Sequence, residues 1–319
     1  MKTNNIYLFT FLIFFLFISN NLLSQPGTVA YHLKISALSG NFNGVLNPAD
    51  RFSVVESIGD LNGDGVIDIA VGAYCDGDGG LNKGAVWILF LNSNGTVNSH
   101  QKISDTQGNF FGILDSWDEF GLGITSLGDV NGDGINDIAV GARYDDDGGT
   151  DCGAVWILFL NTNGTVLGHQ KISNTYGNFS GVLDSDDLFG ISLSIIGDLN
   201  NDGINELAVS SVNDDDGGTD CGAIWILFLN ANGTVNNYQK ISNSAGNMIG
   251  LLNAGDRFGR SIEFIGDFNN DGVYDIAVGS FFDDDGGYNR GAVWILFLNS
   301  NGTVNSYQKI SDTQGNLTG

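Results

Sequence analysis

A short acidic loop recurs along the chain and carries the residue types best suited to chemistry. The stretch "GDVNGDGINDIAVG" begins at Gly128, and close copies begin at Gly59, Gly197 and Gly266, at steps of 69 residues. Positions one, three, five and nine of each loop carry side-chain oxygens, and position seven offers its backbone carbonyl. The candidate ligands in the four copies are Asp60, Asn62, Asp64, Val66 and Asp68; Asp129, Asn131, Asp133, Ile135 and Asp137; Asp198, Asn200, Asp202, Ile204 and Glu206; and Asp267, Asn269, Asp271, Val273 and Asp275.

This spacing predicts a site for a hard cation, and calcium fits it best. Ca²⁺ takes about six to eight oxygens at about 2.3–2.6 Å, which flexible carboxylates supply and which the strict octahedron of Mg²⁺ tolerates poorly. Three carboxylates within nine residues also repel one another unless a cation lies among them. We therefore expect about one Ca²⁺ per repeat, with Glu206 as a longer chelating arm in the third copy. The alternative is an Asx-rich turn without metal, because Asp, Asn and Gly favour turns.

Neither an EF-hand nor a catalytic carboxylate pair fits this loop. An EF-hand requires a bidentate Glu at position 12 and flanking helices, but position 12 is Val71, Val140, Val209 or Val278. A catalytic acid and base need different environments to separate their pKa values, and four near-identical loops offer no such difference. The sequence also shows no nucleophile elbow, zinc-ligand spacing or phosphate loop. We therefore expect a protein that is not an enzyme.

A second acidic segment follows in each repeat, as "DDDGG" from Asp145, Asp214 and Asp283 and as "CDGDGG" from Cys75. We predict a solvated loop here, with a weak cation or ligand site as the alternative. Solvated carboxylates would surround one edge of the molecule with negative potential, which complements a basic protein patch or a cation-bridged glycan.

Two more recurring features are accounted for by the strands and turns alone. His100 and His169 share a repeat position with Tyr238 and Tyr307, so they are predicted to be aromatic fillers on a strand. The sequence "NGT" fits a glycosylation acceptor, but the Asn-Gly hairpin turn accounts for it equally well. It occurs at Asn94, Asn163, Asn232 and Asn301.

Composition excludes several classes of partner and architecture. A formal net charge of −25 repels phosphate, so no nucleic-acid partner is expected. The 47 Gly favour many tight turns over long helices. Three Cys are too few for a disulfide scaffold. Cys152 and Cys221 occupy the position of Lys83 and Arg290 in the other copies, which predicts an exposed loop site rather than a bridge.

The N-terminus has the pattern of a secretory signal. Lys2 precedes an apolar run from Ile6 to Ile18, which is too short to span a bilayer, and polar residues follow. We predict a signal peptide over residues 1–24 and a mature, exported chain over residues 25–319 that does not span a membrane.

Each 69-residue unit contains four short strand patterns and no helical periodicity. In the second unit these are "FGLGITSLGD", "DIAVGA", "AVWILFL", which is apolar on both faces, and "TVLGHQKIS" after an Asn-Gly turn. Four antiparallel strands per repeat, with abundant Gly and long loops, are typical of β-propeller blades. The predicted fold class is an all-β propeller built of four-stranded antiparallel blades.

The repeat resembles the FG-GAP repeat of integrin alpha-chain propellers and their bacterial relatives. "FG" occurs at Phe120, Phe189 and Phe258, and "GA" follows about twenty residues later, as at Gly141. The resemblance covers nearly all of residues 27–319 and implies a calcium loop between the first two strands of each blade. The chain departs from the signature in three ways. Phe52-Ser53 replaces Phe-Gly in the first copy, and Ser210-Ser211 and Gly279-Ser280 replace Gly-Ala in the third and fourth. No copy has the Pro that ends the Gly-Ala-Pro half of the signature.

The same resemblance implies a seven-bladed parent. The segment from Gly27 to Ser36 reads as a last strand, which gives five last strands but four sets of the other three. We therefore expect an incomplete ring, with a complete ring of four or five blades as the alternative. The predicted function is a secreted, calcium-binding adhesion or recognition module at a cell surface, with an extracellular protein or glycan as partner. The alternatives are the propeller part of a larger polysaccharide-degrading hydrolase or lyase, and a structural repeat protein of an envelope or matrix.

Overall fold

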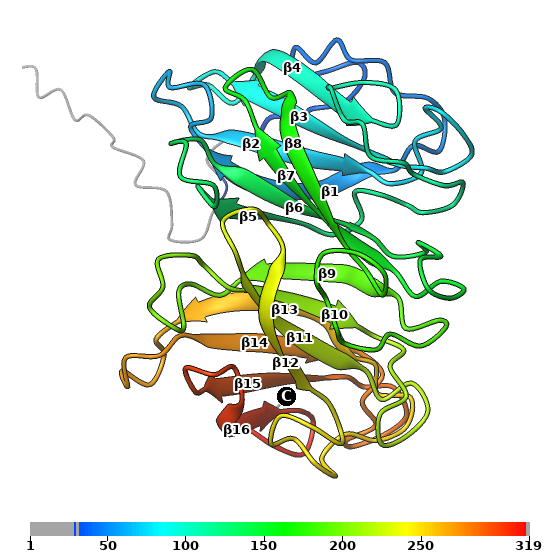
Figure 1. Cartoon of the computed structure of the whole chain (residues 1–319), viewed down its shortest axis with the longest axis vertical. Helices are drawn as coiled ribbons and strands as arrows, with labels where there is room; N and C mark the ends of the chain where they lie inside the picture. The colour runs from blue at the N-terminus through cyan, green and yellow to red at the C-terminus, as the bar shows by residue number, and fades with distance from the viewer. Residues whose placement is uncertain (1–28, 30–31, 317–319) are drawn as a thin grey trace, which may run out of the picture. The chain divides into compact units, whose positions relative to one another are not determined.

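The computed structural model describes residues 29 and 32–316, and within this range sixteen strands form four sheets of four (Figure 1). In each sheet the strands follow chain order and pair antiparallel. The bounds are β1 Phe52–Gly59, β2 Asp68–Ala73, β3 Ala85–Leu91 and β4 Val97–Ser104; β5 Ile124–Gly128, β6 Asp137–Ala142, β7 Ala154–Leu160 and β8 Val166–Ile172; β9 Phe189–Ile195, β10 Leu207–Ser211, β11 Ala223–Leu229 and β12 Val235–Ile241; β13 Phe258–Gly266, β14 Asp275–Ser280, β15 Ala292–Leu298 and β16 Val304–Ile310.

The apolar third strand of each repeat is buried because a sheet is covered on both of its faces. In β7, Val155 and Ile157 face the third sheet, while Trp156 and Leu158 face the first. A corresponding core joins the third and fourth sheets. In β15 the pattern changes to alternating buried and more exposed residues, because Val293 and its neighbours face no further sheet within the described residues.

The first strand of each sheet contacts the first strand of the next. The pairs β1–β5, β5–β9 and β9–β13 are in contact, and side chains join them: the Ser126 amide donates to Oε1 of Glu56 (3.2 Å), and the Ile195 amide donates to Oγ1 of Thr125 (3.3 Å). Successive sheets packed in this way are propeller blades. No hydrophobic core among the described residues joins the first sheet to the fourth, so the ring is not closed.

The two halves of the FG-GAP signature meet where neighbouring blades touch. A Cβ placed on Gly72 would lie 1.9 Å from the carbonyl oxygen of Gly121, and one on Gly84 would lie 2.1 Å from that of Phe120. In these copies a side chain would meet backbone atoms of the next blade, whereas the third copy accommodates Ser210 at the position of Gly72. Phe120 is fully buried beside the contact. Ser53 can replace the corresponding glycine in the first copy, because it is exposed there.

Two predictions concern the N-terminal segment of the chain. The predicted signal peptide, residues 1–24, lies outside the described residues. The predicted last strand at Gly27–Ser36 lies partly outside them, and its described part, residues 29 and 32–36, forms no strand; Ser36 makes only an isolated bridge, to Ser39. Among the described residues, no helix has the length and apolar character needed to cross a bilayer.

Candidate metal centres

Each predicted metal loop connects the first strand of a sheet to the second. In the second repeat, β5 ends at Gly128 and β6 begins at Asp137, the ninth loop position. Gly134 has φ +87°, a left-handed conformation that glycine adopts without strain. Asp129 Oδ1 accepts the amide of Asp133 (2.9 Å), and Asp129 Oδ2 accepts that of Gly134 (2.8 Å). The first carboxylate therefore closes the loop on itself.

The structure brings the predicted side chains of each loop together to different degrees. In all four copies the third and fifth positions are linked, as where Asn131 donates to Asp133. In the third copy one oxygen from each of Asp198, Asp202 and Glu206 lies within 4.8 Å of the others. This is the one group of three potential metal-ligating side chains that comes so close within the described residues. The longer arm of Glu206 reaches Asn200 as well, at 3.1 Å.

The ninth loop position places a carboxylate in the interior. Asp137 is fully buried and accepts the amides of Val130 and Leu160, both at 3.1 Å. Burial raises its pKa to about 7, against the effect of these hydrogen bonds, and nearby Asp133 raises it further. Glu206 is equally buried, with its pKa raised to about 7 mainly by burial. Asp68 and Asp275 have the same environment.

Within the part of the chain that the structure describes, these buried carboxylates have no protein cation beside them. None of the ion pairs formed there involves a metal-loop carboxylate. Buried charge normally requires a partner, and here the neighbouring carboxylates add repulsion. The donor set consists entirely of oxygen, which suits Ca²⁺. The residues present therefore fit a bound calcium ion.

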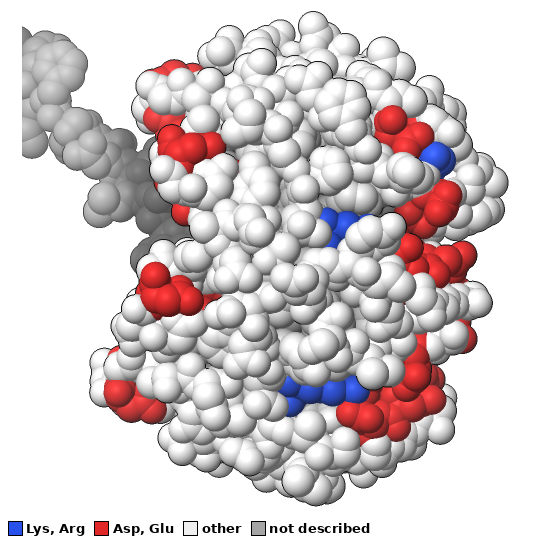
Figure 2. All heavy atoms as spheres, in the orientation of Figure 1, with Lys and Arg blue, Asp and Glu red and all other residues white. Residues whose placement is uncertain are grey.

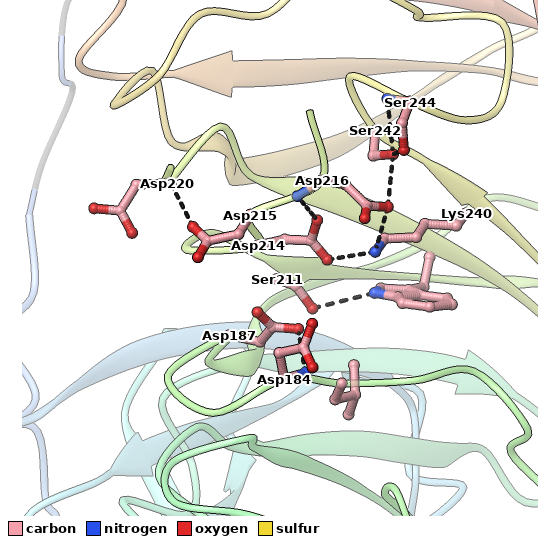
Figure 3. A network of polar contacts seen from close by, with 12 residues as sticks. Asp184, Asp187, Ser211, Asp214, Asp215, Asp216, Asp220, Lys240, Ser242 and Ser244 are labelled. Carbon is pink, nitrogen blue, oxygen red and sulfur yellow. Dashed lines mark hydrogen bonds and ion pairs between the residues drawn. The ribbon is translucent and has the colours of Figure 1, made fainter. Parts of the chain in front are cut away.

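The second acidic segment lies on the edge opposite the metal loops, and the expected solvated loop there is wrong for its first residue. Figure 2 shows acidic side chains along two opposite edges of the sheets. In the third repeat, Asp214 is buried, and Nζ of Lys240 lies 2.6 Å from both Asp214 and Asp216 (Figure 3). Ser242 also donates to Asp216, at 3.1 Å. Only the middle residue, Asp215, is exposed.

The same arrangement recurs in the other repeats, so this edge carries less free negative charge than predicted. The lysine of each "QKIS" segment binds the Asp residues at the first and third positions of the acidic loop and lies over the ring of the repeat's Trp. This pairing was not predicted from the sequence, although the lysine recurs at the same distance from the acidic loop in every copy. The lysines are Lys102, Lys171, Lys240 and Lys309.

A recurring Asp before each "FG" was also missed. Asp187 accepts the Asp184 amide at 2.9 Å and lies near Asp214. Burial is the main cause that raises its pKa to about 7, and Asp214 adds to the effect. Asp118 has the same environment in the second repeat, with its pKa also raised to about 7, chiefly by burial. The sequence signal was the recurrence of Asp two residues before Phe.

The predicted exposure of the cysteine position is wrong. Cys152 and Cys221 are buried free thiols, and Cys221 lies 4.0 Å from Nδ2 of Asn243. At the equivalent position Lys83 pairs with Asp105 at 2.9 Å. A charged pair in one copy is thus replaced by a neutral, buried contact in another. The aromatic-filler prediction is confirmed, because His169 packs against the rings of Phe110 and Trp156.

Comparison with known proteins agrees with this architecture. Residues 121–158 and 258–296 match the family model described as the FG-GAP repeat, so the fold and these matches define a propeller-type protein that carries FG-GAP repeats. The resemblance seen in the sequence is confirmed.

The relatives are integrin alpha chains. The chain is 29% identical to integrin alpha-3 of Cricetulus griseus over 203 residues, 63% of its length, and 33% identical to integrin alpha-6 of Homo sapiens over 168 residues, 52% of its length. It is 36% identical to integrin alpha-PS2 of Drosophila melanogaster over 118 residues, 35% of its length. It spans 17%, 13% and 8% of these relatives respectively.

Proposed function

We propose that the protein is a secreted, calcium-binding recognition module of the cell surface or extracellular space, without catalytic activity. The observation that carries this proposal is the fully buried carboxylate at the ninth position of every metal loop, which has no cation of the described residues beside it. The similarity to integrin alpha chains supports a role in adhesion or recognition. The basic, then apolar N-terminal sequence supports export.

In this proposal each loop holds about one Ca²⁺. The side chains of positions one, three, five and nine and the carbonyl of position seven would be the ligands, as in Asp198, Asn200, Asp202, Ile204 and Glu206. The cation would supply the positive charge that the buried carboxylate lacks. It would also link the loop to the second strand, which begins at or just after the ninth position. Calcium therefore acts as a structural ion that stiffens one edge of each blade.

Calorimetry tests the metal directly. Chelator-treated protein titrated with CaCl₂ is expected to bind Ca²⁺ and to melt at a higher temperature, because a ligand of the native state alone stabilises it. At free Ca²⁺ about a hundredfold above the dissociation constant, each site contributes about 2.7 kcal/mol. No heat of binding, together with a melting temperature unmoved by chelator, would refute the metal sites.

Binding to intact cells tests the recognition role. Fluorescently labelled protein is expected to bind cell surfaces in Ca²⁺ and to lose this binding after chelation. Asp133→Asn should weaken it through the metal loop, whereas Asp215→Asn, an exposed acidic residue on the opposite edge, serves as the charge-matched control. Equal binding with and without Ca²⁺ would show that recognition does not depend on the metal. An absence of binding under both conditions would contradict the recognition role.

A further inference from the structure

Exposed aromatic side chains gather on the second repeat, at the edge opposite its metal loop. Phe111 is 83% exposed, Tyr176 56% and Trp117 53%. The equivalent positions of the first repeat carry Asn43, Gln107 and Ala49, and those of the third carry Ser180, Ala245 and Asp186. The repeat framework does not require aromatic residues at these positions. Aromatic residues occupy all three of these positions in one copy alone, which points to a function.

Two of these aromatic residues line a cleft of about 450 Å³. Phe111 and Tyr176 lie in its wall with Asp115, Asp147, Gln170 and Lys171. The first repeat has a cleft of about 440 Å³ lined by the same ten repeat positions, but with Asn43 and Gln107 in place of the aromatic residues. The fold thus builds the cleft, and the second repeat adds aromatic walls. Its size is within the range of about 300–1,000 Å³ that small ligands occupy.

The third aromatic residue lines a neighbouring cleft of about 540 Å³. Trp117 stands there with Ser116, Tyr144, Asp146 and Thr150. Asp115 lines the first cleft and the next residue along the chain, Ser116, lines the second, so the two clefts are neighbours. A ligand with two or more rings in a row could therefore contact both.

The backbone of Trp117 is held in an unfavourable conformation. Its φ is +82°, and its amide donates to the carbonyl of Leu81 at 2.8 Å. A bulky residue with positive φ is an outlier that costs on the order of 1–2 kcal/mol. The backbone has positive φ at this position in every copy, with Ala49, Asp186 and Gly255 in the other repeats, and Asp and Gly tolerate it better than Trp does. Strain of this kind concentrates at functional sites.

Some of the charged groups of these clefts are already paired, whereas Asp115, Asp146 and Asp151 form no ion pair among the described residues. Lys171 binds Asp145 and Asp147 and lies over the rings of Trp156 and Tyr176. Arg143 binds Glu119 and lies over Tyr144. The protein's own cations thus already lie over Trp156, Tyr176 and Tyr144, and the carboxylates without a partner repel an anionic ligand. What remains is a fixed set of hydrogen-bond donors and acceptors beside exposed aromatic rings.

We propose that these two clefts bind a neutral oligosaccharide. Sugar rings present apolar C–H faces, which pack on Trp117, Phe111 and Tyr176, and hydroxyl groups, which bond to the paired carboxylates, to Gln170 and to Ser116. Carboxylates already paired with lysine or arginine accept hydroxyl hydrogen bonds without rearrangement. This inference names the ligand class of the recognition module proposed above and rests on that proposal.

The test measures binding of neutral glycans to the full secreted protein in Ca²⁺. The probes are an array of neutral hexose, pentose, deoxyhexose and N-acetylhexosamine oligosaccharides, followed by titration calorimetry with the strongest binder. Trp117→Gly installs the residue of the fourth repeat and should fold at least as well. It is expected to weaken binding about tenfold or more, equivalent to about 1.4 kcal/mol. Phe111→Asn combined with Tyr176→Gln, which recreates the first repeat's cleft, is expected to do the same.

The control is Tyr288→Ala, which removes an aromatic side chain 87% exposed on the fourth repeat and outside both clefts; its binding should be unchanged. Absence of binding to every neutral glycan overturns the proposal, as does binding that survives Trp117→Gly and the double substitution. Selective binding of tetra-arginine instead of neutral glycans overturns it in favour of a basic peptide. If calcium uptake and Ca²⁺-dependent cell-surface binding persist in any of these cases, the proposed function stands and only the ligand class is wrong.

Discussion

Lys240 and Asp214 form an ion pair, with Nζ 2.6 Å from Oδ2, in which the carboxylate is buried and the ammonium nearly so. We predict that Lys240→Met destabilises the protein by about 3–5 kcal/mol, because it leaves a buried carboxylate without its partner. Urea unfolding at constant Ca²⁺ measures the change. Arg290→Met, which breaks an ion pair with both side chains about half exposed, should cost no more than about 1 kcal/mol. Equal effects of the two substitutions would contradict the structural role of the buried pair.

Asp187 lies beside this pair, and its ionisation should lower the free energy of unfolding as pH rises. Burial and Asp214 raise its folded-state pKa to about 7, while the Asp184 amide and Lys240 act in the opposite direction. In the unfolded chain the group ionises near its ordinary value of 3.8, so between about pH 4 and 7 the native state retains more protons. The free energy of unfolding therefore falls as pH rises through this window.

Asp187→Asn should reduce this fall by on the order of 1–2 kcal/mol, a value discounted for the screening by Lys240. Urea unfolding of the variant and of the parent protein at pH 4.5 and 7.5 measures the difference, because these two pH values lie just above the pKa of the unfolded and of the folded state respectively. The matched control is Asp215→Asn, an exposed carboxylate of the loop between β10 and β11 that also carries Asp214. A pH dependence that is identical in the parent and in Asp187→Asn would show that this carboxylate is already ionised at low pH.

The close contact between blades leads us to predict that substitution by alanine destabilises the protein at one glycine and not at another. A Cβ on Gly141 would lie 1.9 Å from the carbonyl oxygen of Gly190, which is backbone and cannot move aside easily. Gly141→Ala should destabilise the protein by about 3 kcal/mol or more. Gly168→Ala, where the nearest atom lies at 3.7 Å, should be neutral or stabilising by up to about 1 kcal/mol. Thermal unfolding of the two variants distinguishes these outcomes.

The buried thiols should be unreactive in the native protein. Burial raises the pKa values of Cys152 and Cys221 to about 11, with nearby aspartates adding to the effect, and the thiolate is the reactive form. Reaction with a disulfide reagent at pH 8 is expected to be negligible until denaturant is added, and then to report three thiols per chain. Rapid reaction of either cysteine without denaturant would contradict their burial.

The strands, and the place of the acidic loops between the first and second strand, could be predicted because each rests on a short, local pattern repeated four times. Alternation, Asn-Gly turns and the Asp-Asn-Asp spacing need no knowledge of distant residues. The pairing of Lys240 with Asp214 could not be predicted in this way, because the two lie on a strand and a loop 26 residues apart and meet only through the register of β10, β11 and β12.

The cysteine position shows why equivalence between repeats can mislead. Lys83 at that position suggested exposure, but its side chain is largely buried and its ammonium pairs with Asp105. The neutral residues Cys221 and Asn243 replace this pair in the third copy. The exposed aromatic residues of the second repeat were missed for a different reason. Phe111 and Trp117 come from the loop between β4 and β5, whereas Tyr176 comes from the loop between β8 and β9 and meets Phe111 in one cleft only when the blades pack together.

The charge at Glu206 leads to the last prediction. Glu206 is buried, accepts the Leu199 amide at 2.5 Å, and lies within 4.8 Å of oxygens from Asp198 and Asp202. Without a cation, this charge is repelled by its neighbours; with one, it becomes a ligand.

Glu206→Gln keeps an acceptor for Leu199 but removes the charge. The variant should therefore melt at the same or a higher temperature in chelator, yet bind one Ca²⁺ fewer and gain less stability from Ca²⁺, by about 2.7 kcal/mol at a hundredfold excess over the dissociation constant. Calorimetric stoichiometry and melting curves at pH 8 measure both effects, with Asp215→Asn as a control that changes neither. A variant that binds as many ions as the parent protein would remove Glu206 from the ligand set, and a variant that melts lower in chelator would show that its charge is stabilised by the protein alone.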